Sequence, residues 1–294
     1  MIQFKEGQPF EFLVSSGALG FDGRGWWWEH PLRWLGLIDP KAFVVVAKTV
    51  TDQPRKGNLR MYSPWTCVRT LPGLGATNAV GLTNPGIDHW ISDYLPVAQD
   101  KGYNIAPSIK PENPDEAERM ALLLSKLAFP FVEINVSCPN VAEHVPDDIP
   151  EILRRVGMSK NRMVLKLSLD QVNQRFIEAV DPYVDAYHAI NTIPWDVIFP
   201  GRTSPIQKYS HGLKGGVSGP MIKPHALTAV TAIHQISDKP VIGGGGIFSL
   251  QDVCQFRDAG AAAFSFGSVF LHRPWRPNRI VRQYRRKFHL PKSA

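Results

Sequence analysis

Cysteine is scarce in this chain of 294 residues, and its pattern excludes several kinds of site. Cys67, Cys138 and Cys254 lie far apart and form no Cys-x-x-Cys pair, so they cannot hold an iron–sulfur cluster by themselves. Their odd number indicates free thiols rather than disulfides. The nine histidines are scattered, no His/Cys cluster has metal-ligand spacing, and no Ser-His-Asp order stands out. The sequence therefore predicts no metal site and no catalytic triad.

Long apolar runs are missing as well. None reaches the roughly 20 residues that a membrane helix needs, and the N-terminal Met-Ile-Gln-Phe-Lys-Glu-Gly-Gln lacks the apolar core of a signal peptide. With 44% hydrophobic and 20% charged residues, the composition is typical of a globular protein. We expect a soluble, by default cytoplasmic protein of one or two domains, or a single α/β barrel of the common size of about 250 residues.

Two clusters stand out from this ordinary composition. Seven basic residues between Arg273 and Lys287 contribute to the formal charge of +7. A solvated terminal helix is the favoured interpretation, and a nucleic-acid patch or a dock for an acidic partner are the alternatives. The second cluster is aromatic and consists of Trp26, Trp27, Trp28 and Trp34. It could form a membrane-facing or quinone-facing patch, but such clusters more often pack a helix onto the core.

Eight short apolar segments alternate with helical patterns. The expected strands are 9–16, 42–50, 103–109, 131–136, 162–167, 185–190, 240–242 and 261–266, and the expected helices are 87–100, 113–127, 147–156, 171–180, 223–236, 250–259 and the tail. Two long stretches, 51–83 and 194–214, show no sustained periodicity and are expected to be functional loops. No repeat or linker divides the chain. The alternation predicts an α/β fold, a (β/α)8 barrel that forms one domain over residues 1–294.

Glycines follow the last two expected strands. Gly243, Gly244, Gly245 and Gly246 come after the seventh strand, and Gly267-Ser268 after the eighth. The active site of such a barrel lies at the carboxyl ends of its strands, and phosphates often bind after strands seven and eight. Glycine lets backbone N–H groups approach an anion closely. Flexible turns are the alternative, but glycines at both positions favour phosphate binding.

Polar side chains stand at several other strand ends: Lys48, Asn135, Cys138, Lys166, Asn191 and Thr192. Taken singly, each has an ordinary explanation, since Lys48 could extend to the surface and a buried Asn could be structural. Together at one rim they suit a planar polar ligand that has several hydrogen-bond donors and acceptors.

The segment 135–140, Asn-Val-Ser-Cys-Pro-Asn, resembles the signature loop of class 1 dihydroorotate dehydrogenases, flavin enzymes of pyrimidine synthesis. The resemblance covers almost the whole chain. It also rests on Ser16-Gly17, Ala47-Lys48-Thr49, Asn78-Ala79-Val80-Gly81-Leu82, Lys166-Leu167, Asn191-Thr192, Gly216-Val217-Ser218-Gly219-Pro220, Gly245-Gly246 and Gly267-Ser268. It implies an FMN-dependent oxidation of dihydroorotate to orotate.

The resemblance also assigns roles. FMN would be held by Ala18, Lys48, Thr49, Ser108, Asn135, Lys166, Ile190, Gly219, Gly245, Gly246, Gly267 and Ser268. Lys166 would face the N1/O2 edge of the flavin, and the glycines with Ser268 would hold its phosphate. Dihydroorotate would lie over the flavin against Lys48, Asn78, Val80, Gly81, Leu82, Asn135, Asn140, Asn191 and Thr192. Cys138 would be the general base that removes the C5 proton while C6 gives hydride to flavin N5.

Within the family, Cys138 favours a class 1 enzyme, because a membrane-associated class 2 enzyme would have Ser there. Three motifs look most like the NAD-linked branch: Asn191-Thr192, Gly-Gly-Val-Ser-Gly-Pro at 215–220 and Leu-Thr-Asn-Pro-Gly at 82–86. The second subunit of that branch carries FAD and a [2Fe–2S] cluster. We expect a homodimer, to which such a partner subunit can bind, and neither nucleic acid nor a membrane as a partner. Leu59-Arg60-Met61-Tyr62 departs from the usual Pro-x-Pro-Arg, and Ser108 replaces a frequent Asn. The alternatives are a flavin enzyme for another dihydropyrimidine, which Asn140 and Gly81 argue against, and a non-catalytic flavin-binding subunit.

Overall fold

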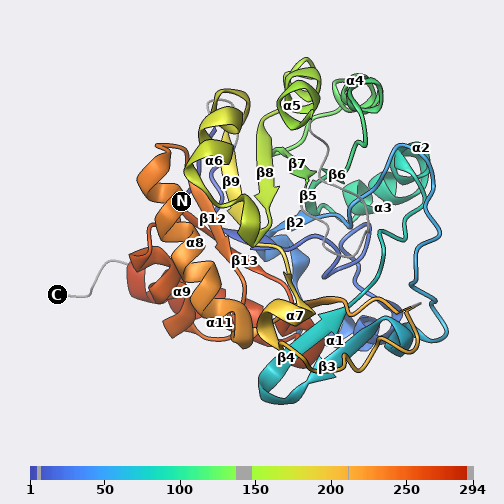
Figure 1. Cartoon of the computed structure of the whole chain (residues 1–294), viewed down its shortest axis with the longest axis vertical. Coiled ribbons are helices and arrows are strands. Elements are labelled where there is room, and N and C mark those ends of the chain that lie inside the picture. Colours follow the sequence, from blue (N-terminus) through green and yellow to red (C-terminus); the bar gives the residue numbers. More distant parts are fainter. Residues whose placement is uncertain (5–7, 137–147, 211, 290–294) are drawn as a thin grey trace.

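The computed structural model describes residues 1–4, 8–136, 148–210 and 212–289 of the chain. Nine parallel strands of this part form one sheet in the order β5-β2-β1-β13-β12-β9-β8-β7-β6. They are β1 (Phe12–Val14), β2 (Val44–Val46), β5 (Asn104–Ala106), β6 (Ser108–Ile109), β7 (Val132–Asn135), β8 (Met163–Leu167), β9 (Ala186–Ala189), β12 (Val241–Gly244) and β13 (Ala263–Phe266). Helices lie around the outside of this sheet (Figure 1), so the predicted (β/α)8 barrel is confirmed.

The expected third strand, 103–109, is two strands in the structure. Pro107 separates β5 from β6, because proline has no N–H to donate to a sheet ladder. β5 pairs with β2 and β6 pairs with β7, so the two ends of the strand order meet at this proline. The carbonyl of Pro107 accepts a 2.9 Å hydrogen bond from the backbone N–H of Glu133. The barrel closes here, and β5 and β6 together take the place of one of its eight strands.

Side chains alternate along each strand between the outer face of the barrel, which the helices cover, and its interior. On β7, Val132 and Ile134 belong to the apolar layer beneath the helices, whereas Glu133 and Asn135 face the interior. The amino-terminal end of the barrel interior is apolar, and its buried residues are Ile2, Phe4, Phe10, Leu13, Val44, Val46, Ala106, Phe131, Val164, Ala186, Ile242 and Ala263. Polar residues such as Ser265 and Glu133 lie one step further toward the carboxyl ends. The barrel interior is therefore apolar at its amino-terminal end and polar toward the carboxyl ends of the strands.

The helices that surround the barrel follow the predicted order. The longer ones are α3 (Leu95–Asp100), α4 (Pro114–Leu124), α5 (Ile149–Gly157), α6 (Gln174–Val180), α8 (Lys223–Ile236), α9 (Leu250–Asp258) and α11 (Arg276–Phe288). The side chain of Asn113 caps α4 by accepting the N–H of Glu116 at 2.9 Å. The final helix, α11, buries Ile280 and Tyr284 and exposes most of its basic residues, as a solvated terminal helix does.

A second, antiparallel sheet lies outside the barrel, and the sequence did not predict it. Its order is β10-β11-β4-β3, formed by β3 (Val68–Leu71), β4 (Gly75–Asn78), β10 (Ile193–Pro194) and β11 (Gly216–Ser218). Figure 1 shows the β3–β4 hairpin projecting beside α7 (Trp195–Ile198). The expectation of loops without secondary structure at 51–83 and 194–214 is therefore wrong. β3 is only partly buried, so it carries no apolar alternation from which a strand could be predicted.

Candidate active site

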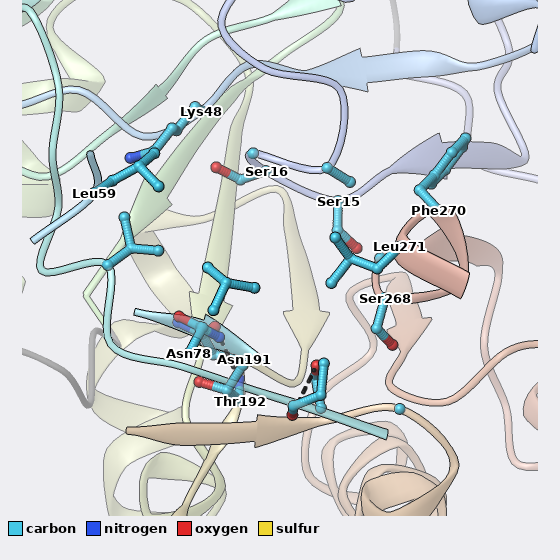
Figure 2. Close-up of a pocket in the computed structure, with 18 of the residues that line it drawn as sticks. Ser15, Ser16, Lys48, Leu59, Asn78, Asn191, Thr192, Ser268, Phe270 and Leu271 are labelled. Atoms are coloured by element: carbon cyan, nitrogen blue, oxygen red, sulfur yellow. Dashed lines mark hydrogen bonds between the residues drawn. The ribbon is translucent and has the colours of Figure 1, made fainter. Parts of the chain in front are cut away.

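A cavity of about 760 Å³ opens at the carboxyl ends of the barrel strands. Its lining includes most residues predicted to bind ligands: Ala18, Lys48, Thr49, Asn78, Val80, Gly81, Leu82, Asn135, Lys166, Ile190, Asn191, Thr192, Gly219, Gly245, Gly246, Gly267 and Ser268. Figure 2 shows several of them reaching the same space from different strands and loops. The predicted catalytic Cys138 and the predicted substrate contact Asn140 lie outside the described residues.

Lys48 follows β2 and is buried at the cavity wall, with only 8% of its surface exposed. Its Nζ donates a 2.5 Å hydrogen bond to the carbonyl of Thr83 and lies 5.4 Å from the centre of the Phe21 ring. A lysine that merely extended to the surface would leave its ammonium in water, so the alternative of a surface lysine is wrong. A buried ammonium at a cavity wall suits an anionic ligand.

Thr49 joins the polar groups at the cavity floor. Its Oγ1 lies 3.0 Å from Ser16 Oγ and 2.9 Å from Ser108 Oγ, and it accepts a 3.1 Å bond from Asn135 Nδ2. Ser108 itself is fully buried and does not line the cavity. Direct contact of Ser108 with a flavin therefore stays a prediction, whereas its bond to Thr49 connects it to the lining.

Beneath this floor lies a buried ionic cluster around Glu133. His188 Nδ1 lies 2.7 Å from one carboxylate oxygen of Glu133, and Ser108 donates to the other at 2.8 Å. Lys166 Nζ lies 4.0 Å from that second oxygen and also borders the cavity. Burial by itself would raise the pKa of Glu133, but the Lys166 charge and the hydrogen bonds from His188 and Ser108 outweigh it and hold this pKa well below its usual range.

The glycines after β12 form a tight cradle. Gly245 and Gly246 have φ of +116° and +89°, a backbone conformation that residues other than glycine rarely adopt. A Cβ at Gly245 would lie 2.9 Å from Ala226 Cβ, and one at Gly246 would lie 2.8 Å from the carbonyl of Gly219. These distances show that the turn is closely packed against α8 and the end of β11. Its shape fits a phosphate held by backbone N–H groups.

The opposite side of the cavity comes from the second sheet. Asn78 ends β4, Gly81 and Leu82 follow it with φ of +65° and +56°, and Asn191 with Thr192 connects β9 to β10. The Asn191 side chain accepts the N–H of Thr192 at 2.9 Å. Figure 2 shows Asn78, Asn191 and Thr192 on this side of the cavity. The antiparallel ladder thus carries amide groups toward the barrel mouth.

Sequence reasoning missed the aromatic part of this mouth. Trp26 and Trp28 stack with ring centres 5.6 Å apart and line the cavity together with Trp65. Trp27 and Trp34 are 60% and 75% exposed, so the prediction that the whole cluster packs onto the core is wrong. The run of tryptophans was a visible signal, but which rings face the cavity depends on the turn that leads into α1 (His30–Trp34).

Other lining residues come from positions without a motif. Arg69, Thr70 and Ser218 lie on the unpredicted sheet, and Leu271 lies on the short helix α10 (Val269–His272) that follows Ser268. Leu59, the first residue of the segment that departs from the family pattern, also lines the cavity. Among the described residues no His, Cys, Asp or Glu group could hold a metal ion, and no helix of that part combines the length and apolar character needed to cross a bilayer.

Fold and site together define a class: an α/β-barrel enzyme whose candidate site lies at the carboxyl ends of its strands and has a shape that suits a planar ligand with a phosphate. The chain belongs to the dihydroorotate dehydrogenase family, whose sequence model matches residues 32–288. The members of this family are oxidoreductases that oxidise dihydroorotate in pyrimidine biosynthesis, and membership implies a flavin cofactor.

Individual relatives support this assignment. The NAD(+)-type dihydroorotate dehydrogenase B catalytic subunit of Desulforudis audaxviator is 34% identical over 272 residues, which cover 89% of this chain and 83% of the relative. The catalytic subunit of the same name from Thermococcus kodakarensis is 32% identical over 264 residues, covering 86% and 83%. A putative dihydroorotate dehydrogenase A (fumarate) of Pediococcus pentosaceus is 30% identical over 277 residues, covering 89% and 86%.

Proposed function

We propose that the protein oxidises dihydroorotate to orotate with FMN bound in the cavity. The observation that carries the proposal is a single cavity that joins the glycine cradle after β12 to a buried cation, Lys48, and to the amides of Asn78 and Asn191. One end fits a phosphate and the other fits a small acid with ring amide groups. When bound, FMN supplies a ring that accepts a hydride from the substrate.

The flavin would be held by groups whose positions the barrel sets. Gly245 and Gly246 would bind the phosphate through their N–H groups, together with Ser268 at the start of α10. Thr49 and Asn135 would hydrogen-bond the ring system from the floor, where their own mutual bond orients them. Lys166 would place its positive charge beside the N1/O2 edge of the ring, and this charge favours electron uptake there.

The substrate would lie between the flavin and the second sheet. Lys48 would neutralise the carboxylate of dihydroorotate, because its ammonium is buried and reaches the cavity. Asn78, Asn191 and Thr192 would bind the ring amides, since an amide side chain both donates and accepts. Apolar lining around Leu82 would exclude water from the reacting carbons.

Cys138 is the proposed general base, and Asn140 a further substrate contact. The support for both is the motif at 135–140, whose first residue, Asn135, ends β7 and lines the cavity. A thiolate can remove the C5 proton only if it is populated or well positioned when the substrate is bound.

We also propose a partner for electron transfer. Two relatives are named as catalytic subunits of the NAD(+) form, a name that implies a second subunit. This chain has three cysteines, too few for a four-thiolate cluster, so an iron–sulfur cluster would belong to the partner. The fumarate-type relative marks the alternative, in which fumarate accepts the electrons directly. A homodimer of this chain is part of the same proposal.

Anaerobic reduction tests the function. The purified protein should carry a yellow chromophore that mass analysis identifies as FMN, and adding dihydroorotate without oxygen should bleach its absorbance. Protein that binds no flavin would overturn the proposal. A flavin that stays oxidised with dihydroorotate but is reduced by dihydrouracil would replace it with the second candidate, a related enzyme for another dihydropyrimidine. We retain this second candidate because Leu59, which belongs to the unusual segment 59–62, lies in the cavity wall.

A further inference from the structure

His188 is a buried histidine that the proposed reaction does not use. It lies on β9 and faces the barrel interior, with 1% of its surface exposed. In the strand register it is paired with Lys166 of β8, which in turn is paired with Asn135 of β7. His188 thus stands beside Lys166, a proposed flavin contact, on the neighbouring strand, and its Nδ1 is 2.7 Å from Glu133.

Gly244 of β12 lies beside this ring. Unlike the two glycines that follow it, Gly244 does not have a positive φ, so its backbone conformation does not require glycine. A Cβ there would lie 3.5 Å from His188 Nε2 and 3.0 Å from Ser265 Cβ. The imidazole thus packs beside Gly244 at ordinary contact distance, and a side chain at position 244 would crowd Ser265 rather than the imidazole.

Two charged groups face the imidazole among the described residues, Glu133 from β7 and Lys166 from β8. The neighbours on β12 and β13, Gly244 and Ser265, carry no charge. Burial lowers the pKa of His188 and outweighs the opposing effect of Glu133, so the fold favours the neutral imidazole. A neutral ring bonded to an ionised carboxylate must donate from Nδ1, and Nε2 then remains free of a proton. The cluster holds one negative and one positive charge, which balance.

We propose that His188 is a positioning residue that compensates charge at the flavin edge: its Nε2 takes up one proton when negative charge arrives beside Lys166, and the contact of Nδ1 with Glu133 stabilises the resulting imidazolium. The inference rests on the proposed function. Hydride transfer from dihydroorotate would bring two electrons and one proton to a bound flavin, and the flavin would then carry one additional negative charge, which Lys166 would face. That charge offsets the field of Lys166, which had disfavoured a second cation. A proton from solvent then converts the His188 imidazole to imidazolium, and the cluster with the flavin is neutral again.

The dependence of the flavin midpoint potential on pH measures this proton directly. Each proton taken up with the two electrons changes the equilibrium constant tenfold per pH unit, which corresponds to about 30 mV. The holoprotein should show a slope that corresponds to two protons over a pH range around and below neutrality, and to one proton at higher pH. The His188→Asn variant should bind flavin but follow the one-proton slope throughout, because the Asn amide can donate to Glu133 in place of Nδ1 but cannot titrate.

A matched control and a second readout make the test specific. His234→Asn changes an exposed histidine of α8 and should leave the slope unchanged. Infrared difference spectra of the wild-type protein with isotope-labelled histidine, taken between oxidised and reduced states, should show imidazolium bands on reduction. This readout needs no variant and therefore applies even if His188→Asn does not fold.

Three results are distinguishable. A two-proton slope that persists in His188→Asn assigns the proton to another group, such as the flavin ring, and overturns the inference. A one-proton slope in the wild-type protein, with no imidazolium bands, also overturns it while leaving the proposed function intact. Failure to bind flavin or to be reduced by dihydroorotate is the failure of the proposed function itself.

Discussion

The floor and the mouth of the cavity are built in different ways. At the floor, Thr49, Asn135 and Lys166 stand on or directly after barrel strands, and a continuous chain of hydrogen bonds and ion pairs ties them to Ser108 and Glu133. At the mouth, the lining comes from a small antiparallel sheet and from partly exposed aromatic side chains. The floor is thus part of the folded core, whereas the mouth is an addition to it.

This difference predicts different consequences of substitution. A change at the floor should affect both the free energy of unfolding and ligand binding, because the same groups hold the barrel interior together. A change at the mouth should affect ligand binding and electron transfer with little effect on stability. The predictions below test this contrast, from the largest expected effect to the smallest.

Glu133→Gln should give the largest loss of stability. The substitution removes the charge that pairs with Lys166 and leaves a buried ammonium without its counterion, at a cost of roughly 3 kcal/mol in the free energy of unfolding. Urea denaturation followed by circular dichroism measures it. The control is Glu151→Gln on α5, where the carboxylate pairs with Arg154 and Arg155 in solvent and should matter far less. Equal losses in the two variants would contradict the assignment of Glu133 to a buried network.

Lys48→Met should give the largest loss of activity. The variant keeps an apolar stem of similar length but cannot neutralise the substrate carboxylate, so anaerobic flavin reduction by dihydroorotate should slow about 100-fold, a typical cost of losing a charge-stabilising contact. Stopped-flow absorbance measures the rate. Lys101→Met, which removes an exposed lysine paired with Asp100, is the control and should reduce the flavin at the wild-type rate. A Lys48→Met enzyme as fast as this control would remove Lys48 from the substrate site.

Gly246→Ala should weaken flavin binding about tenfold, because the new Cβ meets the carbonyl of Gly219 in a backbone conformation that alanine rarely adopts. Equilibrium dialysis of the apoprotein with FMN measures the affinity. The control is Gly201→Ala, which also has a positive φ, of +71°, but nothing within 4 Å of its Cβ position. It carries similar backbone strain away from the cavity. If both variants lost flavin affinity equally, backbone strain rather than the shape of the cradle would be responsible.

Lowering the pH should destabilise the protein through two buried groups beneath the cavity floor, His188 and Glu133. Burial lowers the pKa of His188, so the unfolded chain takes up a proton first as pH falls below the ordinary histidine pKa of about 6.5, and stability decreases. The lowered pKa of Glu133 gives stability that is present above the ordinary glutamate pKa and is lost as pH falls through the folded-state pKa. Thermal unfolding of the flavin-free protein across this range should show the first loss in the wild type and a smaller one in His188→Asn. Identical pH profiles would show that His188 titrates freely in the fold.

Trp26→Phe should have the smallest effect. It removes the 3.1 Å hydrogen bond from Trp26 Nε1 to the carbonyl of Gly17 while keeping an aromatic ring at the mouth. The expected cost is about 1 kcal/mol or less in stability, with a few-fold weaker flavin binding because Gly17 lines the cavity. Trp27→Phe, at an exposed ring, is the control for both measurements. A loss as large as that of Glu133→Gln would place Trp26 with the floor and remove the contrast between the two regions.

The floor could be predicted from the sequence because its signals are local. A buried strand ending in a polar residue, as at Lys48, Asn135 and Lys166, places that residue at the carboxyl rim once the strands alternate with helices. The glycine runs after the seventh and eighth strands indicated the proposed phosphate site in the same way. The substrate's name came from resemblance to a family, and the family is confirmed, whereas periodicity alone would have ended at a planar polar ligand.

The rest depended on contacts between residues far apart in the chain. The second sheet pairs β4 with β11 across more than a hundred residues, and its strands are only two to four residues long, too short to show apolar alternation. The ion cluster could not be predicted either, because Glu133, Lys166 and His188 come from three strands and only the barrel brings them together. The sequence alone determined the alternation of strands and helices and the residues at the strand ends, because these depend on local periodicity. Which polar groups meet inside the barrel was decided by tertiary structure, because strand register and closure at Pro107 set those distances.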